Sequence, residues 1–171
     1  MIKRDLASIL KKLSSQYPVV TVTGPRQSGK TTLVKMVFPE WQYVSLEEPD
    51  MRDYAVRDPR GFIAAFPERT ILDEAQRAPD LFSYIQTHVD DLGKEEVYIL
   101  TGSFNFGLME GISQSLAGRV AVLELLPFSF VELDHVNRVP DSIETLMFTG
   151  GYPRIYDKRL DPQRWYADYV T

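Results

Sequence analysis

The stretch VTGPRQSGKTTL, from Val22 to Leu33, decides the fold class of this 171-residue chain. It joins a short apolar run at 19–23 to a helical pattern at 31–38. Between them, Gly24 to Thr31 match the pattern G-x-x-x-x-G-K-[ST] in the strand–loop–helix context that this pattern needs. A glycine-rich loop can aim successive backbone N–H groups at phosphate oxygens, and the following helix adds its positive N-terminal end. The stretch predicts a phosphate-binding loop rather than an ordinary glycine turn with an exposed lysine.

Individual residues of this loop have predicted contacts with a nucleotide. Lys30 can reach the β- and γ-phosphates, so it is both a binding and a catalytic candidate. Thr31 can offer its hydroxyl to Mg²⁺, which keeps several waters and takes phosphate oxygens. The predicted nucleotide-binding residues are Gly24, Pro25, Arg26, Gln27, Ser28, Gly29, Lys30, Thr31 and Thr32.

Short apolar runs alternate with helical patterns on both sides of the loop. The predicted strands are 19–23, 43–47, 69–74, 97–103 and 119–125, and the predicted helices between them are 31–38, 50–66, 79–93 and 106–117. Alternation of this kind predicts β–α–β units, and strands that are apolar throughout are typical of a sheet covered on both faces. We expect an α/β fold with a mainly parallel five-stranded sheet and helices on both faces.

The two ends of the chain read as helical. The first residues have apolar side chains at helical spacing, which places Arg4 and the neighbouring lysines on the solvated face. After Pro127 the pattern predicts helices at 127–133, at 141–149 with a cap formed by Asp141 and Glu144, and at 161–170, with a break at 150–154. The expected division is a core of residues 1–126, including an N-terminal helix at 1–16, and a helical extension of residues 127–171. We expect this extension to be the start of a truncated C-terminal region.

An acidic pair, Asp73 and Glu74, ends the third predicted strand. Ligand sites of open parallel sheets lie at the carboxyl ends of the strands, beside the loop that follows the first strand. Asp73 can therefore hold Mg²⁺ together with Thr31, and Glu74 can orient and deprotonate an attacking water. The alternative is a solvated strand end. A GTPase would have D-x-x-G at this place, whereas here Gln76 stands where the glycine would be, and the guanine-reading N-K-x-D does not occur in the chain. ATP is favoured over GTP.

The fourth and fifth predicted strands offer further candidates. Thr101, Ser103 and Asn105 follow the fourth strand, and one of them can sense the γ-phosphate, with Ser103 as the catalytic choice; the alternative is a helix cap. Arg119 can stabilise transition-state charge in cis or in a neighbouring subunit, or simply pair with a carboxylate. Arg154 follows a sharp turn and is a candidate for testing. His88 and His135 suggest no metal triad.

Composition and charge narrow the classes of protein. The chain has no cysteine, which excludes disulfides and cysteine-ligated zinc and is compatible with the cytoplasm, the expected location. Residues 1–69 have 11 basic and 8 acidic side chains, whereas residues 70–171 have 8 and 16. The acidic second half argues against a broad nucleic-acid surface on this fragment, although DNA could be bound through other parts. No run is long and apolar enough for a membrane span, and the charged N-terminus is not a signal peptide.

Several of these motifs together resemble one family. TGPRQSGKTTL, ILDEAQ, LTGS, LAGRV followed by LPFSFVEL, and GGYPR occur in the order typical of the AAA_14 family of P-loop ATPases, whose members usually continue into a C-terminal DUF4143 domain. The resemblance implies an AAA-like sheet of the ASCE type, which has an extra strand between the two Walker strands, and Mg-ATP as the ligand. It assigns Walker A to Gly24–Thr32, Walker B to Asp73, the catalytic glutamate to Glu74 and the sensor to 101–103.

The leading hypothesis is an ATPase that serves as a motor or switch for an absent C-terminal module, a protein partner or a homo-oligomer. A second reading is an ATP-binding switch or scaffold that hydrolyses slowly until a partner supplies an arginine. A third is a helicase-like ATPase, which would need a second motor domain. A small-molecule kinase is weaker, because no lid segment is evident.

Overall fold

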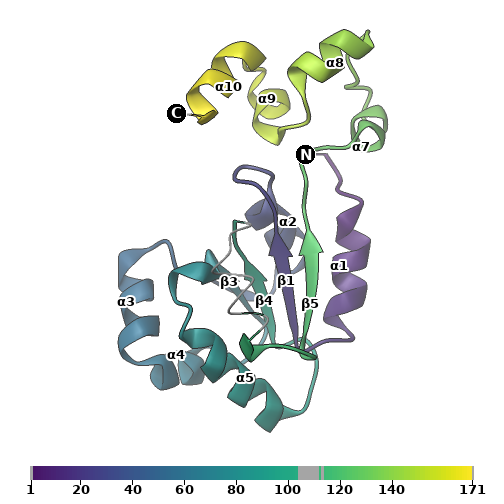
Figure 1. Cartoon of the computed structure of the whole chain (residues 1–171). Helices are drawn as coiled ribbons and strands as arrows, with labels where there is room; N and C mark the ends of the chain where they lie inside the picture. The colour runs from purple at the N-terminus through teal and green to yellow at the C-terminus, as the bar shows by residue number, and fades with distance from the viewer. Residues whose placement is uncertain (1, 104–111, 113, 171) are drawn as a thin grey trace.

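Five strands form one parallel sheet in the computed structural model, which describes residues 2–103, 112 and 114–170 (Figure 1). The strands are β1 (Val19–Thr23), β2 (Gln42–Ser45), β3 (Thr70–Asp73), β4 (Tyr98–Thr101) and β5 (Val120–Glu124). Their order is β2-β3-β4-β1-β5, and every pair is parallel. The predicted α/β fold is confirmed. β4 lies between β1 and β3, as the resemblance to ASCE proteins implied.

Helices connect the strands and then continue beyond the sheet. Before and between the strands they are α1 (Leu6–Ser14), α2 (Lys30–Val37), α3 (Pro49–Arg57), α4 (Pro59–Ala65), the 3₁₀ turn Ala75–Arg77, and α5 (Leu81–Leu92). After β5 follow α7 (Phe130–Asp134), α8 (Ile143–Thr149), α9 (Pro153–Lys158) and α10 (Pro162–Val170). The predicted helix at 106–117 lies largely outside the described residues.

The sheet has an apolar core on each face, because neighbouring residues of a strand point to opposite sides. On one face, Leu10 of α1 and Leu33 and Val34 of α2 pack against strand residues such as Val20 and Ile99. On the other face, α3, α4 and α5 contribute side chains such as Phe62, Phe82 and Ile85, which pack with Val44, Leu72 and Leu100. The prediction of helices on both faces is confirmed.

Two local predictions about helices differ from the structure. The stretch 50–66 forms two helices instead of one, because Asp58 leaves the helical conformation and its side chain caps α4 by accepting a hydrogen bond from the Gly61 N–H at 2.9 Å. The predicted cap by Asp141 and Glu144 is wrong. Ser142 caps α8, with its hydroxyl accepting from the Thr145 N–H at 3.2 Å.

The helices after β5 lie beyond the carboxyl ends of the strands, on the same side as the loop that follows β1 (Figure 1). The Leu125 N–H donates to the Thr23 carbonyl at 2.8 Å, so the chain stays beside the end of β1 for one residue after β5. Among the described residues, no helix is both long and apolar enough to cross a lipid bilayer.

Gly24 is the position where the loop leaves β1 against this neighbouring chain. Its φ is 140°, and a Cβ at this residue would lie 2.2 Å from the Leu125 carbonyl oxygen. Backbone carbonyls cannot move away as the end of a flexible side chain can. Only glycine therefore fits where the phosphate loop begins.

We expect Gly24→Ala to destabilise the fold more than Gly118→Ala. A positive φ costs an alanine about 1–2 kcal/mol in the left-handed region, where Gly118 lies, and about 1–3 kcal/mol in the glycine region of Gly24. Gly24 adds the overlap with Leu125, whereas no described atom lies within 4 Å of a Cβ at Gly118. Denaturant unfolding of both variants measures the difference, and equal losses of unfolding free energy would contradict this account of Gly24.

Candidate active site

The loop after β1 is shaped by residues with positive φ. Gly24, Gln27 and Gly29 have φ angles of 140°, 60° and 95°. Lys30 folds back across this loop, and its Nζ donates to the Gly24 and Pro25 carbonyl oxygens at 3.0 and 2.8 Å. Its side chain is buried, and loss of water lowers the pKa of Lys30, with Glu74 and Asp73 opposing this effect. The ammonium group is thus held at the place where the motif would bind phosphate.

The Asp73 carboxylate is the meeting point of four segments. Thr31 at the start of α2 donates its hydroxyl to Asp73 Oδ2 at 2.9 Å, and Tyr43 of β2 donates to the same oxygen at 2.6 Å. Thr101 at the end of β4 donates to Oδ1. Burial and the bond to Asp73 raise the pKa of Tyr43, so its phenol remains a donor. Tyr43 and Thr101 therefore orient a carboxylate that lies directly beside the Thr31 hydroxyl.

Glu74 follows Asp73 in an unusual backbone conformation. Its φ and ψ are 56° and 44°, the left-handed region that few non-glycine residues adopt. The Gln76 side-chain amide donates to the Glu74 carboxylate. This conformation turns the chain away from the direction of β3, and the Glu74 side chain lines the same cavity as Lys30 and Thr31.

This cavity has a volume of about 870 Å³ and is bounded by two parts of the chain. One side is the phosphate loop and the carboxyl edge of the sheet, with Glu47, Glu74 and Arg77. The other side is α9, through Pro153, Arg154, Asp157 and Lys158. Two basic side chains of α9 therefore face the cavity from opposite the loop. A space of this size falls in the range of small-molecule sites.

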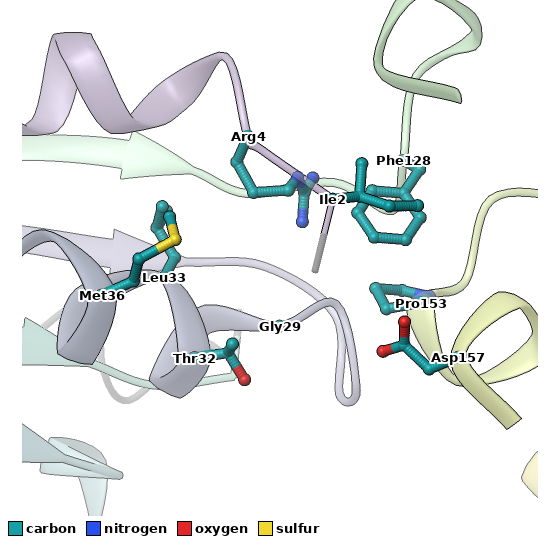
Figure 2. A pocket seen from close by; sticks show the side chains of 9 residues that line it. All are labelled: Ile2, Arg4, Gly29, Thr32, Leu33, Met36, Phe128, Pro153 and Asp157. Carbon is teal, nitrogen blue, oxygen red and sulfur yellow. The ribbon is translucent and has the colours of Figure 1, made fainter. Parts of the chain in front are cut away.

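A smaller, more apolar pocket of about 50 Å³ adjoins the cavity at Gly29, Thr32, Pro153 and Asp157, which line both (Figure 2). Its remaining lining residues come from the N-terminus, α2 and the segment before α7: Ile2, Arg4, Leu33, Met36 and Phe128. A polar cavity beside the phosphate loop thus has an apolar pocket as its neighbour.

Comparison with known proteins identifies the family of the chain that contains this site. The family model described as an AAA domain, AAA_14, matches residues 16–134, which contain the loop, Asp73 and Glu74. The chain belongs to the AAA_14 family. It is 32% identical over 174 residues to the uncharacterized proteins Mb2031c of Mycobacterium bovis and Rv2008c of Mycobacterium tuberculosis. The match covers 99% of this chain, which spans 38% of the length of each relative.

Solved structures support the fold of this AAA_14 domain. The Walker-type ATPase PABY2304 of Pyrococcus abyssi superposes with a TM-score of 0.59 at 18% identity, over 90% of this chain and 65% of that one. AMPPCP-bound DnaA from Aquifex aeolicus gives 0.57 at 16% identity, over 91% of this chain and 59% of that one. At such low identity, these similarities establish the P-loop ATPase fold and nothing finer.

The sensor candidates of the AAA_14 domain lie in different surroundings. Thr101 contacts Asp73, as described above. Ser103 follows Gly102, whose N–H donates to the Val22 carbonyl at 3.3 Å beside the end of β1. The Ser103 hydroxyl is buried and has no hydrogen-bond partner among the described residues. Asn105 lies outside the described residues.

Arg119 does not join the cavity within this chain. It precedes β5, where Val120 pairs with Val19, so it lies at the amino end of the sheet, opposite the phosphate loop. Its guanidinium donates to both Asp90 carboxylate oxygens at 2.5 and 2.9 Å. Of the two roles considered for Arg119, the pair with a carboxylate is the one seen within this chain. Arg154, by contrast, does line the cavity.

The histidines stand apart from the cavity. His88 Nε2 lies 2.6 Å from the Pro67 carbonyl, and His135 is exposed at the end of α7. Within the part of the chain that the structure describes, no three His, Cys, Asp or Glu side chains form a metal-binding group. A metal ion here would depend on Asp73, Thr31 and the ligand's own oxygens.

The prediction that Arg4 lies on a solvated face is wrong. Arg4 is only 7% exposed, because it precedes α1 and turns inward toward the phosphate loop. Its Nη1 donates to the Ser28 carbonyl at 2.9 Å, and its Nε to Glu132 Oε1 at 3.0 Å. These contacts span 24 and 128 residues, so no local pattern in the sequence signals them. Tyr43 was also missed, because an isolated strand tyrosine does not reveal its partner.

We expect Tyr43→Phe to lower the free energy of unfolding by about 1.5–3 kcal/mol, because it removes a hydrogen bond to a buried carboxylate. Tyr54→Phe is the matched control, since the Tyr54 ring packs against Phe62 away from Asp73. Denaturant unfolding without nucleotide makes the comparison. If both variants unfold at the same denaturant concentration, the Tyr43 bond does not hold Asp73.

Proposed function

We propose that this AAA_14 domain binds ATP with Mg²⁺ and hydrolyses it to ADP and phosphate. The observation that carries the proposal is the Thr31–Asp73 contact at 2.9 Å, which puts a hydroxyl and a carboxylate beside Lys30 at the mouth of the phosphate loop. Oxygen groups of these two kinds are ligands that Mg²⁺ accepts alongside phosphate oxygens and water. The donor set therefore fits the ion.

The two adjacent spaces suggest how the nucleotide lies. Its phosphates would occupy the polar cavity, where the backbone of Gly29 and the start of α2 face them. Its base would lie at the apolar pocket between Leu33 and Pro153, which would have to widen from about 50 Å³ to admit it (Figure 2). ATP is preferred to GTP because the chain has no N-K-x-D sequence.

The chemistry requires a positioned water and compensation of charge at the phosphates. Glu74 accepts a proton from the water as the water oxygen bonds to the γ-phosphorus and the bridging bond to the β-phosphate breaks. Lys30 and the loop amides stabilise the charge on the oxygens, and Asp73 and Thr31 would hold the Mg²⁺, which neutralises part of the same charge. Glu74 would first have to leave the Gln76 amide.

A slow switch is the second candidate function. Two observations support it: Glu74 is engaged by Gln76, and Arg119 lies at the far end of the sheet. Hydrolysis could then depend on an arginine from a protein partner or a second copy, an arrangement worth 10³–10⁵ in rate in other nucleotide enzymes. This chain spans 38% of the length of two longer proteins of the family. In such proteins, hydrolysis would serve a motor or switch role toward the rest of the protein or a partner.

Lys30→Ala should weaken Mg-ATP binding by about ten- to a hundredfold, because a charged hydrogen-bonding group contributes about 1.5–3 kcal/mol. A fluorescent ATP analogue measures the affinity by equilibrium titration. Lys94→Ala is the control, since Lys94 is an exposed lysine that pairs with Glu68. Unchanged affinity in Lys30→Ala would remove the phosphate loop from the proposal.

Glu74→Gln should keep the affinity for Mg-ATP. It should lower the single-turnover rate constant of hydrolysis by a factor of about 10²–10⁴, since the amide cannot accept the proton. Glu47→Gln is the control from the same cavity. Equal loss in both variants, or none in either, would show that Glu74 is not the base. If the wild-type protein binds ATP tightly without turnover, the switch is the better description.

A further inference from the structure

The guanidinium of Arg4 connects three segments that are distant in sequence. Besides the Ser28 carbonyl in the phosphate loop and Glu132 in α7, it reaches the Leu126 carbonyl with Nη2 at 2.6 Å. It also lies 4.8 Å from the centre of the Phe128 ring (Figure 2). Arg4 thus joins the loop to the chain that leads from β5 into α7.

Glu132 is prepared for this contact. It is 5% exposed, and its carboxylate accepts from the Asp5 and Ser129 N–H groups at 2.9 Å each as well as from Arg4. The Ser129 hydroxyl accepts from the Glu132 N–H in return, so the pair caps α7. Burial alone would raise the pKa of Glu132, but these donors outweigh it and hold the pKa below its usual value.

A buried ion pair of this kind is not an efficient source of stability. Removing two charges from water costs several kcal/mol per ion, and apolar replacements are often as stable. The pair does fix geometry, because an arginine presents its donors in a rigid planar array. The geometry that it fixes includes the peptide between Ser28 and Gly29.

The orientation of this peptide matters for binding. In a trans peptide the C=O and the following N–H point in opposite directions. When Arg4 holds the Ser28 carbonyl, the Gly29 N–H must point away from Arg4, and Gly29 is a residue that lines the polar cavity as well as the apolar pocket. A loop that is already arranged for its ligand loses less conformational freedom on binding.

We infer that Arg4 is a positioning residue for nucleotide binding, which orients the Ser28–Gly29 peptide and couples the phosphate loop to α7. The inference rests on the proposed binding of ATP. Coupling is reciprocal: if the docked α7 favours the binding-ready loop, a bound nucleotide favours docking of α7 to the same degree. Arg4 would then report occupancy of the site to the C-terminal helices.

Arg4→Lys tests the inference with little risk to the fold, because it keeps a positive charge beside Glu132. One ammonium group cannot reproduce the planar array that spans Ser28, Leu126 and Glu132. We expect the variant to unfold cooperatively and to bind the fluorescent ATP analogue about tenfold more weakly, a difference of about 1.4 kcal/mol. Arg57→Lys is the control, because Arg57 is an exposed arginine of α3 that pairs with Asp53 away from the loop. Wild-type affinity in Arg4→Lys would overturn the inference.

Amide hydrogen exchange gives a second readout that needs no nucleotide. In Arg4→Lys, exchange should be faster in residues 24–31 and in residues 128–135 together, and unchanged in α5. Faster exchange in α7 alone would make Arg4 a structural clamp and overturn the positioning role. Because this comparison uses the free protein, it tests Arg4 even if the wild-type chain fails to bind ATP, which would refute the proposed function instead.

The coupling is tested by adding Mg-ATP in the exchange experiment. Nucleotide should slow exchange of the α7 amides in the wild-type protein and in Arg57→Lys, but not in Arg4→Lys. If nucleotide protects the loop of the wild-type protein and leaves α7 unchanged, the two segments are not coupled.

Discussion

The buried carboxylate of Asp73 is the constraint on which the arrangement of the site depends. A carboxylate that is 7% exposed needs hydrogen-bond donors, and those nearest to it come from β2, β4 and the start of α2. These donors reach one group only if β3 lies between β2 and β4 and the phosphate loop turns back over the same edge. The hydroxyls that satisfy the charge thus also link β2, β3, β4 and α2 at the carboxyl end of the sheet.

The opposite charge is satisfied in a different way. Lys30 donates to two carbonyls of its own loop, and its burial disfavours the charged form. A bound phosphate would bring negative charge close to this buried ammonium group and so favour its charged form. Asp73 and Lys30 thus form two ends of one polar site, one rich in acceptors and the other in donors. This division is what binding a phosphate together with a divalent cation demands.

The sequence predicts the parts of this site that follow each other closely along the chain. The loop from Gly24 to Thr31 and the strand that ends in Asp73 have local patterns with strong geometric consequences, and the strand order follows the family resemblance. The burial of Arg4 was not predicted, because an arginine before an amphipathic helix has the same local pattern whether it is solvated or buried. Its partner Glu132 is 128 residues away, and no periodicity links the two. The division of the chain after residue 126 stays a prediction.

The helices after β5 hold the phosphate loop from a second direction. The Tyr169 hydroxyl of α10 donates to the Arg26 carbonyl at 3.2 Å, while Arg4 connects Ser28 to α7. The rings of Tyr169, Trp165 and Tyr152 pack together within 5.2 Å between their centres, which ties α10 to the start of α9. One carbonyl of this short loop is therefore held directly by α10, and a second is linked to α7 through Arg4. A shift of these helices relative to the sheet must break one of these bonds or reshape the loop. The helical region is thus a structural part of the proposed nucleotide site, although the phosphate loop and the acidic pair both come earlier in the chain.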